Sequence, residues 1–323
     1  MKLRWEHTTV GIRFDSARQM QGGPGPKHKR SRSRRKVIGR LLFLAPVVIY
    51  VLAMFVYPLI YNVSLSFRDY TVSSIATGLA PLVGLANYHA IFSNPIMSET
   101  SRNTLIFVLG SIVFQVLIGM GLAIFFNQRF PLSRLLRTLM LIPWLLPLIV
   151  SGSAFKWILD QNNGVLNWAL MELHLIHAPL GWLDSPHLAL ISVTLTNIWI
   201  GIPFDLVLFY SGLQAIPEEL YEASSLDGAN RWHTFWSITI PSMRGVIAIV
   251  LMLGLIYTLK VFDIIIALTG GGPANASQIL STWAYQLSFS DFSFSQGAAV
   301  ANIMIIIALI FTVGYLVFIR TED

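Results

Sequence analysis

The sequence predicts an all-α polytopic membrane protein with six transmembrane helices. Of its 323 residues, 54% are hydrophobic and only 12% are charged, whereas a soluble domain carries about 25% charged residues. Six apolar stretches reach the length of about 20 residues that a helix needs to cross the hydrocarbon core. They lie at 38–61, 104–126, 137–159, 188–212, 246–268 and 298–319, and together they make 38–320 one transmembrane domain. Prolines inside three of them are expected to be tolerated.

The first 37 residues form a separate basic tail. Residues 1–40 contain twelve Lys or Arg and two acids, whereas the remainder contains ten Lys or Arg and fourteen acids. A Gly/Pro-rich segment at 22–26 is followed by a run of mostly basic residues at 27–36. Such a tail cannot bury a core and is predicted to be disordered. Nucleic-acid binding is an alternative. The favoured interpretation is a cytoplasmic flank that orients the first span on an anionic leaflet.

The basic residues predict that both termini are cytoplasmic. Residues 127–137, 213–245, the tail and the C-terminal end together carry eighteen Lys or Arg. The loops on the opposite side carry two, Arg68 and Arg102. Because Lys and Arg accumulate on the cytoplasmic side, 213–245 is predicted to be a cytoplasmic loop.

The loop at 213–245 contains clear signals for the start and end of a helix. Pro217 suits the first position of a helix, and Glu218 and Glu219 follow in its first turn, where the helix dipole favours acids. Gly228 provides a stop, because glycine adopts left-handed backbone angles at little cost. Asn230 is predicted to cap a second, short helix. The loop therefore exposes acids and large apolar side chains together, as a binding surface for a partner would.

The segment Glu222-Ala223-Ser224, with Gly228 six residues after Glu222 and then Ile238-x-Ile240-Pro241, resembles the EAA loop of ATP-binding-cassette (ABC) importer permeases. In that family the loop is a coupling helix seated in a groove of the cytoplasmic ATPase. The resemblance assigns this coupling to Glu222, Ala223, Ser224, Asp227, Gly228, Ala229, Ile238 and Pro241. The alternative is an interfacial amphipathic helix, which would carry Lys or Arg on its polar face.

Four further segments resemble carbohydrate-importer permeases, and most closely the larger, MalF-like partner of the permease pair. They are 84–88, 141–144, 212–217 and 262–273. The resemblance implies the type I importer fold in a bacterial inner membrane and a heterodimer with a second related permease. It also implies an ATPase dimer and an extracytoplasmic sugar-binding protein as partners. The chain itself is expected to bind no cofactor, with ATP and Mg held by the ATPase, and to be no enzyme.

The fourth predicted span carries the parts of a sugar site. Gly201 and Pro203 weaken the helix beside an amide and aromatic rings, which suit sugar hydroxyls and sugar faces. The alternative is a proline kink with packing aromatics. The resemblance to the maltose permease implicates Asn197, Ile200, Gly201 and Phe204 in substrate binding, and Tyr257, Thr258 and Val261 in the fifth span. Val261 departs from the amide of that relative, which puts maltose itself in doubt.

Asp205, Lys260 and Asp263 are ionisable residues at membrane depth, where such residues usually serve function. Lys260 and Asp263 stand three residues apart, as a pair on one helix face or as a polar lining of the pathway. His174 and His177 are also three apart and compatible with one helix face, but no metal site is predicted from one pair.

These observations predict a subunit that carries a carbohydrate, with neutral sugars favoured because only Lys260 offers a cation near the site. The alternative is a proton-coupled sugar transporter without an ATPase, using Asp205 or Asp263 as the proton carrier.

Overall fold

The computed structural model describes residues 43–320, which are mostly helical. These residues hold no strand, only an isolated β-bridge between Arg68 and Leu82. The predicted all-α class is therefore confirmed. The predicted tail and the first residues of the first predicted span lie outside the described residues. The chain divides into two units at Pro58, and each unit is described by itself.

Five helices in the described part of the chain are long and apolar enough to cross a membrane, and a bent pair supplies a sixth. The five are Phe43–Ser66, Pro95–Asn127, Ala189–Gln214, Arg231–Leu259 and Phe294–Tyr315. The first contains η1 (Leu52–Val56) and α2 (Tyr57–Ser66), and the second and third are α5 (Pro95–Asn127) and α10 (Ala189–Gln214). The fourth contains α12 (Arg231–Thr234), η2 (Phe235–Thr239) and α13 (Ile240–Leu259). The fifth lies in α16 (Phe294–Arg320).

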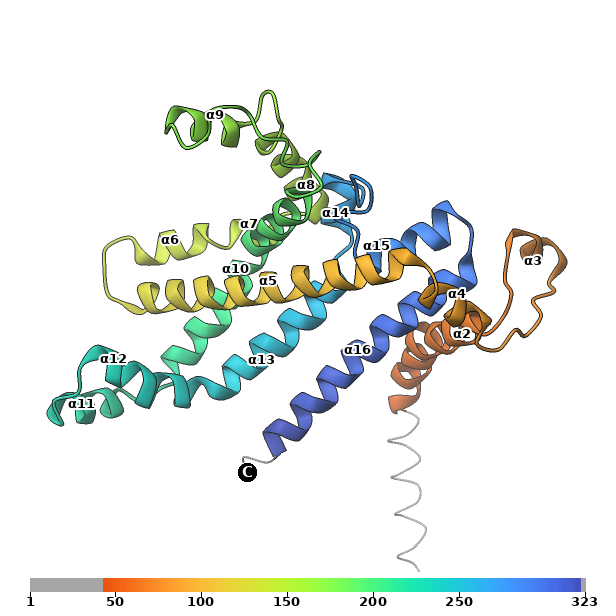
Figure 1. Ribbon diagram of the computed structural model, residues 1–323. Coiled ribbons are helices and arrows are strands. Elements are labelled where there is room, and N and C mark those ends of the chain that lie inside the picture. The colour runs from red at the N-terminus through yellow and green to blue at the C-terminus, as the bar shows by residue number, and fades with distance from the viewer. Residues whose placement is uncertain (1–42, 321–323) are drawn as a thin grey trace, which may run out of the picture. The chain divides into compact units, whose positions relative to one another are not determined.

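Shorter helices connect these spans. They are α3 (Val72–Thr77), α4 (Ala86–Phe92), α9 (Val165–Glu172), α11 (Glu218–Leu226), α14 (Asp263–Leu268), α15 (Leu280–Tyr285) and η3 (Gln286–Ser290). Figure 1 shows α11 and α12 beyond one end of α10 and α13, with α14 near the opposite end of α10. His174 and His177 follow the end of α9 and share no helix face, contrary to the spacing-based expectation.

The third predicted span, 137–159, is a broken helix. It consists of α6 (Ser133–Leu139), α7 (Ile142–Leu145) and α8 (Leu148–Ile158), and its two halves meet at 97°. Pro147 causes the break, because the residue before a proline is pushed out of the helical region. Leu146 accordingly has an extended backbone, with ψ of 141°.

The fifth predicted span, 246–268, is two helices rather than one. The first begins upstream at Arg231, so the short helix expected after Asn230 continues into the membrane. It ends at Leu259, and α14 begins only at Asp263. Among the carbonyls exposed at this break, that of Val261 accepts a hydrogen bond from the Ser281 hydroxyl.

α5 and α10 pack along each other, and two glycines permit their close approach. A Cβ atom on Gly119 would lie 2.7 Å from the Cβ atom of Asp205. A Cβ atom on Gly201 would overlap the side-chain amide of Gln115, which fills that space. This amide donates a hydrogen bond of 2.9 Å to the carbonyl of Asn197. The glycine predicted to weaken the helix therefore admits a neighbouring side chain.

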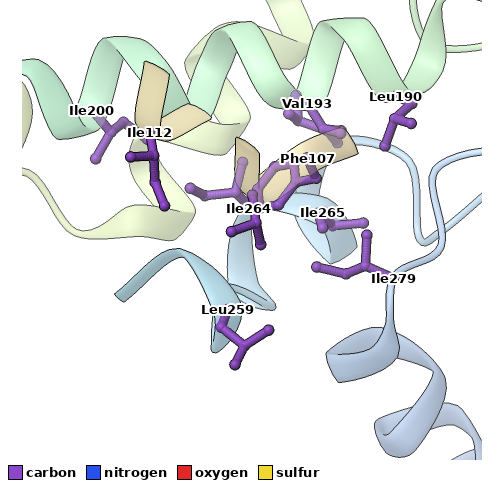
Figure 2. Close-up of a cluster of buried hydrophobic side chains, with 11 residues drawn as sticks. Phe107, Ile112, Leu190, Val193, Ile200, Leu259, Ile264, Ile265 and Ile279 are labelled. Carbon is purple, nitrogen blue, oxygen red and sulfur yellow. The ribbon is translucent and has the colours of Figure 1, made fainter. Parts of the chain in front are cut away.

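Two buried apolar clusters continue this interface toward both ends of the bundle. The first joins α5, α10, the end of α13 and α14, as Figure 2 shows, through Phe107, Ile112, Leu190, Val193, Ile200, Leu259, Ile264, Ile265 and Ile279. The second lies nearer α11 and contains Met120, Ala123, Phe126, Leu206, Phe209, Leu213, Met243 and Val250. Both clusters hold α13 to the α5–α10 pair.

A buried polar network fastens α16 to α2 and α4. The side-chain amide of Asn302 donates to the hydroxyls of Ser66 (3.0 Å) and Tyr88 (3.2 Å). Its carbonyl accepts from the Asn62 amide at 2.7 Å. Such a network is satisfied within the protein, as a low-dielectric setting requires.

We predict that Gly119→Ala destabilises the protein whereas Gly121→Ala does not. The added methyl at 119 overpacks the α5–α10 interface, at a cost of about 1–3 kcal/mol. A Cβ atom at Gly121, two residues along the same helix, meets nothing within 4 Å. Thermal unfolding of the two variants in detergent checks this. Equal melting temperatures would contradict the close-approach role of Gly119.

Candidate functional site

Residues 216–241, here the α11–α12 element, begin with a sharply ended helix. Gly228 follows α11 with φ of +75°, in the left-handed region that glycine adopts at little cost. The N–H groups of Gly228 and Ala229 donate to the carbonyls of Ser225 and Ser224, each at 3.1 Å. This pattern is the Schellman motif. The predicted helix stop is confirmed, whereas Pro217 occupies the N-cap, one residue before the predicted first helical position.

Side-chain hydrogen bonds tie α11 to the helix that follows it. The Asn230 side chain accepts from the N–H of His233 at 2.8 Å, so the predicted cap is confirmed. The hydroxyls of Ser224 and Thr234 are 2.9 Å apart, and Ser224 is buried. The hydroxyls of Tyr221 and Thr239, at the start of α11 and the end of η2, are 3.2 Å apart. The two helices are thereby linked into one unit.

One side of the α11–α12 element is hollowed by a cavity of about 400 Å³. Six of the eight residues predicted for ATPase coupling line it: Ala223, Ser224, Asp227, Gly228, Ala229 and Ile238. Of the other two, Glu222 is exposed on α11 and Pro241 lies in the first turn of α13. Leu226, Trp232 and Trp236 are also exposed. One acid, Asp227, and the apolar side chains of Leu220 and Ile238 thus line this concave surface.

A second group of side chains lies within the membrane spans. The ring of Phe204 on α10 lies 5.9 Å from that of Trp144 on α7 and 5.6 Å from that of Tyr257 on α13, centroid to centroid. The Lys260 ammonium nitrogen lies 4.8 Å above the Tyr257 ring. We call these four residues the aromatic cluster. Trp144 and Tyr257 are each about half exposed in this chain, and Lys260 covers one face of the Tyr257 ring. The exposed parts of the two rings are available to a ligand.

The other residues predicted for substrate binding are packed in the protein. The Asn197 amide donates to the Ser111 hydroxyl at 2.9 Å, and Asn197 is 5% exposed. The space beside Gly201 is filled by the Gln115 side chain. Ile200 belongs to the first apolar cluster, Thr258 is buried, and Val261 packs against that same cluster.

Three residues of these contacts were not predicted from the sequence: Trp144, Ser111 and Gln115. Trp144 lies in the 141–144 segment that carried part of the family resemblance, so a signal was present. Ser111 and Gln115 had no local signal, because their roles depend on contact with another helix.

The ionisable residues do not form the predicted pair. Lys260 follows the end of α13, whereas Asp263 begins α14, so they share no helix face. Lys260 contacts the Tyr257 ring instead. Asp205 is 3% exposed and lies on the α10 face that meets Gly119.

Comparison with known proteins decides the family. The protein-family model described as "Binding-protein-dependent transport system inner membrane component" matches residues 115–320 of the sequence. The chain belongs to this family. The sulfoquinovosyl glycerol transport system permease protein SmoG of Agrobacterium fabrum is 35% identical over 284 residues, 88% of this chain and 91% of that protein. The trehalose/maltose transport system permease protein MalF of Thermococcus litoralis is 35% identical over 237 residues, 73% and 79% of the two chains.

A solved structure shares the fold of this binding-protein-dependent permease. A chain of a bacterial ABC transporter that imports the acidic polysaccharide alginate superposes with a TM-score of 0.77 at 22% identity. The match covers 90% of the permease and 99% of that chain. The predicted importer-permease fold is therefore confirmed.

The permease is the translocation subunit of an ABC importer and an inner membrane component. Subunits of this kind are not enzymes, because the ATPase is a separate subunit. A proton-coupled transporter without an ATPase is not favoured. The EAA pattern and the carbohydrate-permease segments thus identified the family from sequence.

We predict that Ser224→Ala and Thr234→Val both loosen the α11–α12 element, and that Thr234→Val has the larger effect because the Thr234 hydroxyl also donates to the Asn230 carbonyl at 3.1 Å. Each removes one partner of a partly buried hydroxyl pair, and the double variant should lose little more than Thr234→Val alone. The coupling energy should be about 0.5–1.5 kcal/mol. Hydrogen exchange over residues 218–239 of the assembled importer measures it. Additive effects would show that the two hydroxyls act independently.

Proposed function

We propose that this permease imports a carbohydrate and is driven by a cytoplasmic ATPase dimer bound at the α11–α12 element. The observation that carries the proposal is the placement of the aromatic cluster. Phe204 and Tyr257 lie on α10 and α13, the two helices that enter and leave the α11–α12 element. A movement of that element reaches Tyr257 through continuous helix, and it reaches Phe204 through the short turn that joins α11 to α10.

The link to Tyr257 is long and stiff. Arg231–Leu259 is one helix of 29 residues with a short π-helical segment. Tyr257 therefore stands about 40 Å along the helix axis from Arg231. ATP-dependent closure of the ATPase would displace the α11–α12 element as a unit, and α13 would carry that displacement to the cluster. The shift between inward-facing and outward-facing states is set by the differential binding of nucleotide.

The partners follow from this arrangement and from the family. We propose a heterodimer with a second related permease, as the family resemblance implies, and this chain exposes many apolar side chains that such a partner could cover. An extracytoplasmic binding protein would deliver the sugar. ATP and Mg would be held by the ATPase, with no cofactor on this chain. The two termini and 213–245 would be cytoplasmic, as the excess of basic residues favours.

The substrate class rests on two supports. The transport systems of SmoG and MalF are named for sulfoquinovosyl glycerol and for trehalose and maltose. Aromatic rings such as Phe204 and Tyr257 suit the apolar faces of sugars. Among the described residues of the cluster, Lys260 is the one cation, so we propose a neutral sugar. Lys260 and Asp263 are exposed and remain candidates for the polar lining of the pathway, whereas Asp205 is buried against α5.

We predict that Gly228→Val abolishes uptake while the protein still reaches the membrane. Valine does not adopt the backbone angles of Gly228 without strain, so the end of α11 and the cavity beside it change shape. Gly245→Val is the matched control, because a Cβ atom there meets nothing within 4 Å and the backbone is helical. Radiolabelled sugar uptake and membrane abundance are measured together. Normal uptake by the Gly228 variant would contradict the coupling role.

We predict that Phe204→Ala and Tyr257→Ala each lower the maximal uptake rate about two- to tenfold, the range expected for one aromatic contact. Phe114→Ala is the control, since Phe114 is an exposed aromatic on α5 outside the cluster. Uptake is measured in proteoliposomes with saturating sugar-loaded binding protein. Equal rates for all three variants would remove the cluster from the pathway.

A further inference from the structure

A second cavity lies where α5 and α10 end, beside the broken third span. Its volume is about 590 Å³. It is bounded by Asn127 at the end of α5, by the turn that follows, by the start of α6 and by the last turns of α10. The side-chain amide of Gln214 donates to the side-chain oxygen Oδ1 of Asn127 at 2.7 Å, which closes one edge. The cavity therefore lies at the level where two membrane spans stop.

Three arginines line this cavity and no acid does. Arg129 and Arg134 are exposed, and Arg137 is half-buried. The Arg137 guanidinium stacks on the Tyr210 ring, with its central carbon 4.0 Å from the ring centroid. Stacking fixes the plane of the guanidinium and leaves its N–H edge free for a bidentate acceptor. Three guanidinium groups without a carboxylate in the lining favour an anion, and phosphate oxygens match their geometry.

The surface beside the cavity is apolar. Leu132, Leu135, Leu136 and Leu139 are all exposed, and all lie on or next to α6. A free phosphate would gain nothing from exposed leucines, whereas the acyl chains of a lipid would cover them. Charged and apolar surfaces thus adjoin at the end of the spans, as the headgroup and the chains of a phospholipid do.

We propose that this cavity, here the arginine cavity, binds the phosphodiester headgroup of an anionic phospholipid, with the lipid chains lying on the leucines of α6. The lipid would fasten α6 to the end of α10. Tyr210 and Gln214 lie on that end of α10, a few residues before α11 begins. The bound lipid therefore fixes the helix end on which the α11–α12 element is built.

The test uses the importer purified with its partner subunits, in phosphatidylcholine nanodiscs with increasing fractions of phosphatidylglycerol. Native mass spectrometry of the released complex counts retained lipids, and ATPase activity with loaded binding protein is recorded alongside. The variants are Arg134→Gln/Arg137→Gln and Arg134→Lys/Arg137→Lys. The second keeps the charge that sets topology but lacks the planar fork. Arg102→Gln/Lys156→Gln, at the other end of the spans, is the charge-matched control.

We expect the wild type and the control to retain phosphatidylglycerol equally, and the Gln variant to bind it about 30-fold more weakly, at about fivefold per arginine lost. The Lys variant should fall between them. Transport-linked ATPase activity should rise with phosphatidylglycerol in the wild type and not in the Gln variant.

Three results would overturn the proposal. Equal loss of lipid in the Gln variant and in the control would show a general charge effect. Displacement of the lipid by millimolar inorganic phosphate would assign the cavity to a free anion. Unchanged lipid retention with release of the ATPase subunits would assign the arginines to an acidic protein surface.

Discussion

The close approach of α5 and α10 is the constraint on which the rest of the structure depends. It brings the amides of Asn197 and Gln115 within reach of partners on the facing helix. Within a bilayer no water satisfies such groups, and leaving one unpaired costs about 1–3 kcal/mol. Gly119 and Gly201 make those contacts possible because neither presents a Cβ atom. Larger side chains would separate the helices and leave the amides unpaired at membrane depth.

The packed α5–α10 pair is the part of the fold relative to which the end of α13 and α14 are placed. α14 packs on α8, where a Cβ atom on Gly152 would lie 2.8 Å from that of Ala267. The break at 260–262 separates α14 from the long helix that ends at Leu259. A displacement passed along that helix can therefore be taken up by the break. Tyr257 lies just before it, so its ring would move relative to α14.

Local signals in the sequence were enough for some features and not for others. The backbone requirement at Gly228 and the cap at Asn230 act within a few residues, and both were predictable. The break at 260–262 contains neither proline nor glycine, so no local sequence signal predicted it. Its Val261 carbonyl is satisfied by Ser281, twenty residues away. The role of Gly201 was hidden for the same reason, because Gln115 reaches it from another helix.

The aromatic cluster supplies only part of what a sugar needs. Rings and one cation are present, but the Asn197 amide is already bonded to Ser111, and Gln115 to a backbone carbonyl. The side-chain amide of Asn197, predicted to bind the sugar, thus bonds to the facing helix instead. Sugar hydroxyls require hydrogen-bond partners at the site. If this packing persists during transport, the second permease of the proposed heterodimer would supply those partners.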